Sequence, residues 1–430
     1  MARKAASAKT REGTVSPEKA PALRSSVSMR GLSIWCATAA PFASPVLEQN
    51  ARADVCVVGA GIAGLTTAYL LAREGKSVVV LEKDKIGGGE TSHTSALLSN
   101  VMDAGYRRIE DLRGKTGARL AAQSHSSAIT RIDYIVAKEH ILCNFERLDG
   151  YLFRSAATPE KVLHEEFEAA RRAGVVVKEL AGPPAHLKLG PCLQFRRQAQ
   201  FHPLRYMAGL AAAVKRYGGR LYTGTEVAEI KGGKSAEIMT VNNKKISAAA
   251  VVIATNVPVN SGVNVRAKLA AYRSYVIGIP VPTDSVPNAL YWDTEDPIHY
   301  VRRARVKQGR SERHVLVVGG EDHKKSQAED IEKRFARLRA WSRTHFGTQA
   351  EPEFHWSGQT MNTLDGLALI GRNPGDEDNV YIATGDSGMG LTHGTIAGIL
   401  LTDLILGRHN PWTSLYDPSR AALLAPQSPE

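Results

Sequence analysis

Short apolar runs alternate with stretches of helix-forming residues, and the clearest succession runs from Asp54 to Lys83. Residues 55–58 form a valine-rich run that predicts a buried parallel strand, and 65–73 are rich in helix formers. Gly75 is placed to end that helix, and 77–81 is a second apolar strand. The stretch therefore predicts a complete strand–helix–strand unit.

Three glycines follow the first strand at G-x-G-x-x-G spacing: Gly59, Gly61 and Gly64. In this motif the first glycine permits a tight turn, the second lets a pyrophosphate approach the backbone, and the third lets helix and strand pack closely. The first helical turn offers free N–H groups and the positive end of its dipole to the phosphates. Glu82 follows the second strand, where it can accept hydrogen bonds from ribose hydroxyls. The pattern predicts a dinucleotide site and leaves FAD and NAD as alternatives.

The remaining pattern predicts a β-rich middle of the chain, followed by a last strand, glycine-rich turn and helix. Helices are predicted over 107–138 (two helices around Gly114 to Gly117), 159–173, 203–217, 326–346 and 391–406. Strands are predicted at 143–154, 175–177, 220–222, 226–230, 237–241, 251–254 and 379–383, with a β-rich block over 272–320. The final helix would aim its N-terminus at an anion or an electron-rich ring edge.

Composition narrows the classes of protein. With 430 residues, 43% of them hydrophobic and 23% charged, the chain is long enough for two or three ordinary globular domains. The apolar runs are too short for a membrane span. The cysteines are scattered and none belongs to a C-x-x-C pair, so we expect no metal site, no iron–sulfur cluster and no disulfide framework. This usage predicts a cytoplasmic location.

The net charge of +12 is concentrated in two places. Residues 1–32 are basic and lack a hydrophobic period, which predicts a flexible arm, with a transit peptide as the alternative. A second cluster is predicted to rim a solvated hairpin or loop that could dock an acidic electron-transfer partner. It comprises Arg302, Arg303, Arg305, Lys307, Arg310 and Arg313. No nucleic-acid reading motif accompanies these charges, so nucleic-acid binding is not expected.

Several motifs in matching order make the chain resemble the FAD-dependent oxidoreductases of the D-amino-acid-oxidase (DAO) family. They are VVGAGIAGLTTAYLL with Glu82, GETSHTSA, RLDGYLFR, VVIATNVP, WSGQTMNTLDGLALIGR and ATGDSGMGLTHGTIAG. The resemblance covers residues 33–420 and includes the bacterial branch of gamma-glutamylputrescine oxidoreductases and flavin–Rieske fusion proteins. It implies an α/β fold in which a Rossmann-type, glutathione-reductase-like FAD-binding domain carries an inserted antiparallel β-sheet substrate domain.

The implied domains are discontinuous in sequence. Residues 53–140, 200–262 and 355–410 would form the FAD-binding domain, and 141–199 with 263–354 the substrate-binding domain. Residues 411–430 would form a C-terminal tail.

The resemblance also implies the residues that would bind FAD. The ADP half and the start of the first helix would involve Gly59, Ala60, Gly61, Ile62, Ala63, Gly64, Glu82, Lys83 and Val227. The pyrophosphate, ribityl and flavin parts would involve Thr91, Ser92, His93, Ser95, Ala254, Thr255, Gly385, Gly388, Met389 and Gly390. His93 falls where some relatives link a histidine covalently to the flavin, so covalent attachment is an alternative.

The implied reaction is oxidation of a C–N bond of an amine or amino-acid-like substrate by hydride transfer to flavin N5. His393, Gln359 and Tyr275 are the predicted catalytic residues. Gln359 stands where amino-acid-oxidising relatives place an arginine that holds the substrate carboxylate. Because glutamine lacks that charge and fork, a small-molecule amine is favoured over an α-amino acid.

The electron acceptor is left open between oxygen, a quinone and a separate iron–sulfur protein. The strand at 314–319 lacks the lysine that promotes reaction with oxygen in sarcosine-type oxidases, and no Rieske ligand motif follows residues 416–420. Two other functions stay as alternatives, an electron-transfer or assembly flavoprotein without its own amine oxidation and an NAD-dependent dehydrogenase.

Overall fold

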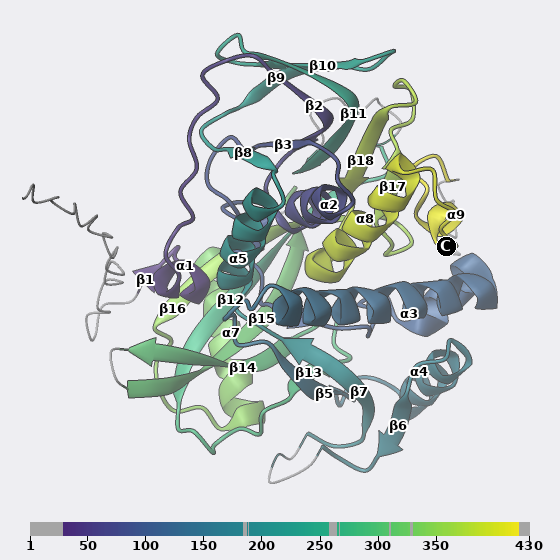
Figure 1. Cartoon of the computed structure of the whole chain (residues 1–430). Coiled ribbons are helices and arrows are strands. Elements are labelled where there is room, and N and C mark those ends of the chain that lie inside the picture. Colours follow the sequence, from purple (N-terminus) through teal and green to yellow (C-terminus); the bar gives the residue numbers. More distant parts are fainter. Residues whose placement is uncertain are drawn as a thin grey trace, which may run out of the picture.

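The computed structural model describes residues 29–420, except 184–186, 188, 258–264, 266, 309–310 and 327–329. Two sheets form its upper and lower parts in Figure 1, with helices between them. The predicted basic arm lies almost wholly outside the described residues, as do Arg310 and residues 421–430.

The first sheet has the strand order β17-β18-β11-β2-β3-β8, and the hairpin β9–β10 is attached to β11 through β10. Its strands are β2 (Ala51–Val58), β3 (Val78–Leu81), β8 (Arg220–Tyr222), β9 (Val227–Lys231), β10 (Ala236–Thr240), β11 (Lys245–Asn256), β17 (Leu369–Arg372) and β18 (Val380–Thr384). From β18 to β8 the neighbouring strands are parallel, as the strand–helix–strand prediction requires.

Two helices begin at the carboxyl ends of these strands and pack against each other. Helix α2 (Ile62–Arg73) follows β2 directly, and α8 (Gly390–Ile405) follows β18. Their close contact depends on glycine, because a Cβ at Gly394 or Gly398 would lie 2.6 or 2.4 Å from a side chain of α2. This packing brings both helix N-termini to the same region (Figure 1).

The remaining helices surround this pair. They are α1 (Ile34–Thr38), α3 (Tyr106–Lys138), α4 (Glu160–Arg172), α5 (Pro203–Arg216), α7 (Ile331–Phe346), α9 (Thr413–Tyr416) and the 3-10 turn η1 (Glu90–Ser92). Helix α3 is interrupted at Gly114, whose φ of 70° and ψ of 171° are not helical, so the predicted break there is confirmed. Helix α7 begins at 331 rather than at the predicted 326.

The second sheet is largely antiparallel and has the order β1-β16-β12-β15-β14-β13-β5-β7-β4, with β6 paired to β7. Its strands are β1 (Met29–Arg30), β4 (Leu97–Leu98), β5 (Glu146–Phe153), β6 (Val177–Leu180), β7 (Cys192–Gln200), β12 (Ala270–Val281), β13 (Leu290–Asp293), β14 (Tyr300–Gln308), β15 (Ser311–Lys324) and β16 (Phe354–Asn362). Together the two sheets confirm the predicted α/β class with an antiparallel second sheet. Strand β16 pairs with β12, although residues 355–362 were assigned to the FAD-binding domain.

The prediction that the basic cluster rims a solvated hairpin or loop is wrong for one of its residues, Arg302. Arg302 is only 4% exposed, and its guanidinium lies 5.0 Å from the centre of the Trp35 ring. The other described members lie on the β14–β15 hairpin, where Arg303 and Arg305 are partly or fully exposed. One arginine of this basic run is therefore buried in the core.

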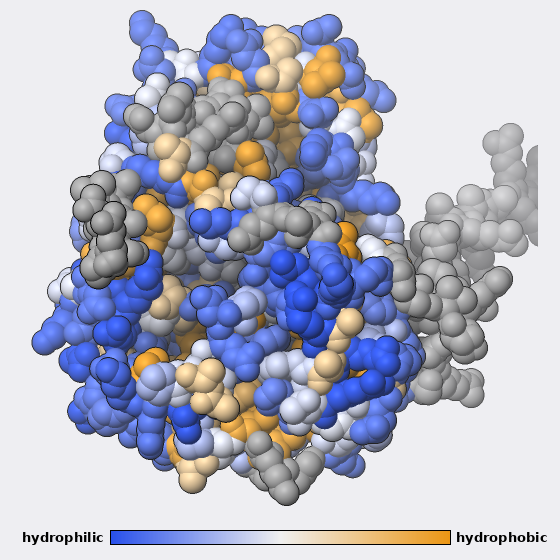
Figure 2. Space-filling model, turned by 180° about the vertical axis from the view of Figure 1, so that it is seen from behind, coloured by the Kyte–Doolittle hydropathy of each residue, from blue (hydrophilic) through white to orange (hydrophobic). Residues whose placement is uncertain are grey.

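Among the described helices, none is both long enough and apolar enough to cross a bilayer. On the face in Figure 2, hydrophilic residues predominate and hydrophobic ones are scattered among them.

Candidate functional site

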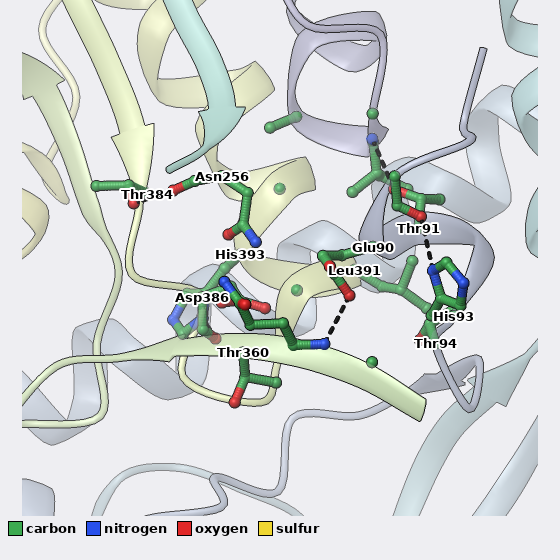
Figure 3. Close-up of a pocket in the computed structure, with 18 of the residues that line it drawn as sticks. Glu90, Thr91, His93, Thr94, Asn256, Thr360, Thr384, Asp386, Leu391 and His393 are labelled. Carbon is green, nitrogen blue, oxygen red and sulfur yellow. Dashed lines mark hydrogen bonds between the residues drawn. The ribbon is translucent and has the colours of Figure 1, made fainter. Parts of the chain in front are cut away.

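One cavity of about 570 Å³ lies between the two sheets and is lined by residues of both. Gly59, Gly61 and Glu82 line it, as do Gly388 and Gly390. The two ends of the chain therefore meet at a single space, whose volume is typical of small-molecule sites. Figure 3 shows the η1 segment and the start of α8 facing this space from different sides.

The glycine turn after β2 is shaped by backbone contacts. Gly59 has a φ of +103°, and a Cβ there would lie 2.4 Å from the carbonyl oxygen of Ala254. A Cβ at Gly64 would lie 1.9 Å from the carbonyl oxygen of Gly59. At Gly61 the nearest atom to a Cβ would be Thr91 Oγ1 at 3.4 Å, so this position opens onto the cavity. The first and third glycines are needed for packing, and the second leaves room for a ligand.

The start of α2 is arranged to bind an anion. Gly61 is its N-cap and offers no side chain to the free N–H groups of the first turn. Thr91 Oγ1 accepts one hydrogen bond, from the backbone N of Ile62 at 3.2 Å. Glu82 is held at the cavity edge because Oε2 accepts from Ala60 N at 2.8 Å and Oε1 from Asp84 N at 2.9 Å. A phosphate-binding helix end and a fixed carboxylate thus stand side by side.

The loop from 89 to 96 is clamped from outside the cavity. The Ser92 hydroxyl donates to the carbonyl oxygen of Gly89 at 2.8 Å, so it stabilises the turn instead of lining the cavity. Trp356 Nε1 donates to the carbonyl oxygen of His93 at 2.9 Å, and Trp35 Nε1 to that of Thr94 at 2.6 Å. These bonds fix the backbone from which His93 and Thr94 face the cavity (Figure 3).

Most predicted cofactor-binding residues gather around this one cavity. The lining includes Gly59, Gly61, Ile62, Ala63, Glu82, Lys83, Thr91, His93, Ser95, Val227, Ala254, Thr255, Gly388, Met389 and Gly390. Ala60, Gly64, Ser92 and Gly385 are not among the lining residues. Ala60 donates its backbone N–H to Glu82, and Gly64 allows close packing at the start of α2. Ser92 makes the turn bond described above, and Gly385 adopts a left-handed turn with a φ of 73°. The open glycine, the uncapped helix end and the fixed carboxylate fit an extended dinucleotide such as FAD.

His393 lines the cavity, but both its ring nitrogens are engaged. Nδ1 donates to the carbonyl oxygen of Asp386 at 2.8 Å, and Nε2 lies 3.2 Å from Nε2 of His125. Burial lowers the pKa of His393 to about 4, so the ring is neutral near pH 7. In this arrangement His393 links the start of α8 to α3.

The two other predicted catalytic residues are placed differently. Gln359 lines the cavity, donates its backbone N–H to Glu90 Oε2 at 2.7 Å and accepts from Lys325 Nζ at 3.3 Å. Tyr275 is not among the lining residues, and its hydroxyl lies 3.1 Å from His323 Nε2. Its ring packs edge-on against Phe335 of α7, on the face of β12 opposite the cavity. The geometry therefore does not support a contact between Tyr275 and substrate.

Three carboxyls line the cavity and were absent from the predicted catalytic set: Asp103, which is exposed, and Asp322 and Asp386, which are partly exposed. Desolvation by the surrounding protein raises the pKa of Asp103 to about 7, with further raising by the charges of Asp322 and Asp386. Burial raises the pKa of Asp322 and of Asp386 to about 6. Carboxyls with near-neutral pKa values in a ligand cavity are typical of groups that hold or exchange protons.

The alternation of side chains along a strand is the sequence signal that could have predicted the part of the cavity wall that β12 and β15 form. Side chains alternate across a strand, so Ser274 faces the cavity where its neighbour Tyr275 faces α7. On β15, Asp322 lines the cavity, while Glu321 binds Arg337 of α7. Tyr300 of β14 completes the wall, with its hydroxyl 2.6 Å from Ser274 Oγ.

Among the described residues, one group could offer three ligands to a metal ion: Asp293, Glu295 and His299. Asp293 Oδ2 already accepts from His299 Nδ1 at 2.8 Å, and none of the three lines the cavity. This group lies around the connection between β13 and β14, two interior strands of the second sheet, and not at the site.

Arg302 supports the loop that carries His93 and Ser95. Its guanidinium donates to the carbonyl oxygens of Ala96 at 2.6 Å and Phe201 at 2.9 Å, and burial lowers its pKa to about 9. We expect Arg302→Met to lower the free energy of unfolding by about 2–4 kcal/mol, because two buried carbonyls lose their donor. Urea denaturation measures the change, and the exposed Arg305→Met is the matched control. If the two variants are equally stable, Arg302 does not hold the loop through these hydrogen bonds.

Comparison with known proteins agrees with this geometry. The profile of the family described as FAD dependent oxidoreductase (DAO) matches residues 54–404. A protein of Bacillus subtilis (strain 168) named as a Rieske 2Fe-2S iron-sulfur protein is 30% identical over 377 residues, covering 87% of this chain and 73% of the relative. The gamma-glutamylputrescine oxidoreductase of Escherichia coli (strain K12) is 27% identical over 392 residues, covering 86% of each chain.

The fold is also similar to that of a solved structure. The crystal structure of glycine oxidase from Geobacillus kaustophilus superposes with a TM-score of 0.71 at 19% identity, covering 86% of this chain and 100% of that one. The predicted resemblance is thereby confirmed, and FAD, the cofactor of the family, replaces the nicotinamide alternative. This chain belongs to the DAO family of FAD-dependent oxidoreductases.

Proposed function

We propose that this protein oxidises the carbon–nitrogen bond of an amine or amino-acid-like substrate, with hydride transfer to N5 of bound FAD. The observation that carries the proposal is the single cavity, which joins the glycine turn after β2 to the wall of the second sheet. A cofactor and a substrate bound there would share one space, as direct hydride transfer requires.

The reaction converts R–CH2–NH2 into an imine by loss of a hydride from carbon and a proton from nitrogen. FAD supplies the hydride acceptor when it is bound. Water then hydrolyses the imine R–CH=NH to the aldehyde R–CHO and ammonia. The protein contributes position and proton exchange, and the carboxyls of Asp103, Asp322 and Asp386 are suited to take a proton from the substrate ammonium near pH 7.

An amine fits the substrate end better than an α-amino acid does. Gln359 is uncharged at a position on the cavity wall, and no arginine is among the described lining residues. A substrate carboxylate would therefore meet the carboxyls of the lining without an arginine to pair with it. Similar proteins include one named gamma-glutamylputrescine oxidoreductase and one named glycine oxidase, so both kinds of substrate occur among relatives.

We expect at least one amine in a broad panel to bleach the yellow flavin absorbance of the purified protein under anaerobic conditions. The panel should contain primary and secondary amines, diamines and amino acids, with dithionite as the positive control for reduction. If dithionite bleaches the flavin and no amine does, the protein is an electron-transfer or assembly flavoprotein, and the proposal is wrong.

The same samples identify the electron acceptor. After reduction by the amine, the flavin is exposed separately to oxygen, to a soluble quinone and to a Rieske-type iron–sulfur protein. The acceptor that restores the flavin absorbance fastest is the one we propose for turnover. The relative named as a Rieske protein is the reason for including the third.

A further inference from the structure

The substrate end of the cavity is lined by carboxyl groups that influence one another's charge. Asp322 and Asp103 both raise the pKa of the Tyr300 hydroxyl by their charge, after burial, so the three side chains form one electrostatic cluster. Asp386 acts on Asp103, and Glu90 acts on Asp386, which extends the cluster along the lining. This acidic wall is defined here as Asp103, Asp322, Asp386 and Glu90.

No basic side chain among the described lining residues balances the acidic wall. The lysine of the lining, Lys83, lies beside Glu82 at the glycine-turn end, and the lining includes no arginine. Lys325 reaches the side chain of Gln359 at 3.3 Å but does not line the cavity. His393 is neutral near pH 7 for the reason given above. Several carboxyls therefore border the cavity without a cation among the described lining residues, although the charges of His299 and Arg334, which lie outside the lining, lower the pKa of Asp322.

Asp322 carries a second, independent sign of a missing ligand. Its Oδ1 atom is buried and has no hydrogen-bond partner among the described residues, although a carboxylate oxygen is costly to bury unpaired. An interaction with Ser274 lowers the pKa of the same carboxyl. Asp322 comes from the second sheet, whereas the glycine turn and the start of α8 come from the first. It is therefore separate from the elements that would hold FAD.

We propose that the substrate is a diamine or a longer polyamine, and that its distal ammonium is bound by Asp322 with Asp103 beside it. The proposal rests on the proposed function and specifies its substrate class. One amine must lose its proton, and the carbon bonded to it donates the hydride, while the other amine stays charged and pairs with the carboxylates. A chain whose far end is a methyl group loses this pairing, and one whose far end is a carboxylate is repelled by the acidic wall.

The wild-type protein tests the proposal without any substitution. Dissociation constants for 1,5-diaminopentane, n-hexylamine and 6-aminohexanoate are measured at pH 8 from the perturbation of flavin absorbance in the FAD-loaded protein without oxygen. We expect the diamine to bind at least about tenfold more tightly than hexylamine, and 6-aminohexanoate to bind most weakly. Diamines of other lengths are included to find the best fit. Equal binding of the three, or preference for the carboxylate, would overturn the proposal.

Asp322→Asn then tests the assigned residue. The substitution keeps the shape and removes the charge, so diamine affinity should fall on the order of tenfold while hexylamine affinity stays within twofold. Asp378→Asn changes an exposed carboxylate that pairs with Arg372 at the surface, and it should alter neither value. Flavin content and melting temperature confirm that the variants are folded. A uniform loss for both ligands in Asp322→Asn would count against the assignment.

The outcomes separate this proposal from the one on which it rests. A diamine that binds selectively but does not bleach the flavin supports the acidic wall and rejects amine oxidation. Bleaching by diamine and monoamine alike, with no effect of Asp322→Asn, supports amine oxidation and rejects the assigned substrate class. If no amine binds, both proposals fail.

Discussion

Replacing Gly61 with valine is expected to give a folded protein that purifies without flavin. The position has an ordinary φ of −75°, and the nearest atom to an added Cβ is Thr91 Oγ1 at 3.4 Å, so the chain itself accommodates the side chain. The added methyl groups project instead into the space that a pyrophosphate needs beside the N-terminus of α2. Flavin content per protein should fall at least about tenfold.

Two other glycines provide the controls for Gly61→Val. Gly64→Val is expected to prevent folding, because its Cβ would lie 1.9 Å from the carbonyl oxygen of Gly59. Gly407 follows the end of α8, and a Cβ there would have no atom within 4 Å. The Gly407→Ala protein should therefore keep its flavin and lose only about 1 kcal/mol of stability, because the position has a positive φ. Flavin absorbance and circular dichroism separate the three cases. A Gly61→Val protein that retains full flavin would show that the cofactor does not pass this turn.

The features that the sequence predicted well are those built from neighbours along the chain. The unit from Asp54 to Lys83 folds as read, because strand, glycine turn, helix and strand follow one another and each has its own local signal. The same holds for β18, its turn and α8. Since parallel strands place their carboxyl ends at one edge, these two local units also implied the shared cavity end that the structure shows.

The substrate wall depends on side-chain parity, which local composition does not reveal. Tyr275 was selected by residue type, whereas its neighbour Ser274 is the one that faces the cavity. Strand β7 was missed because Arg196 and Arg197 are both exposed, which breaks the alternation. Arg197 has a φ of 64°, and the β5–β7 register shifts close by, as at a β-bulge. Arg302 was misplaced because only its distant partners, Ala96 and Phe201, distinguish it from a surface arginine.

A buried ion pair anchors the segment at 416–420 to the body of the protein. Arg420 makes bonds of 3.0 Å from Nε and from a terminal nitrogen to the two carboxylate oxygens of Asp365, which also receives Arg113. The Tyr416 hydroxyl lies 2.7 Å from Ser124 Oγ of α3. Asp365 is 3% exposed, so its charge depends on these partners. The segment at 416–420 therefore has a structural role in this fold.

Arg420→Ala is expected to lower the free energy of unfolding by about 3 kcal/mol at pH 7, because it leaves a buried carboxylate with Arg113 alone. Burial would raise the pKa of Asp365, but hydrogen bonds and charge from Arg420 and Arg113 bring it down to about 2. A folded pKa below the ordinary 3.8 means that this stabilisation is complete above pH 4 and is lost as the pH falls toward 2. The difference between wild type and variant should therefore be constant from pH 5 to 8 and shrink below pH 4.

Urea denaturation of the FAD-loaded proteins across this pH range measures the effect of Arg420→Ala. Arg372→Ala is the matched control, since its partner Asp378 is 90% exposed, and surface pairs of this kind contribute at most about 1 kcal/mol. If the two variants lose equal stability at pH 7, the Asp365 pair is not the anchor. If the loss in Arg420→Ala grows as the solution becomes acidic, Asp365 is not the charged partner, because protonation of its carboxylate can only reduce what Arg420 contributes through it.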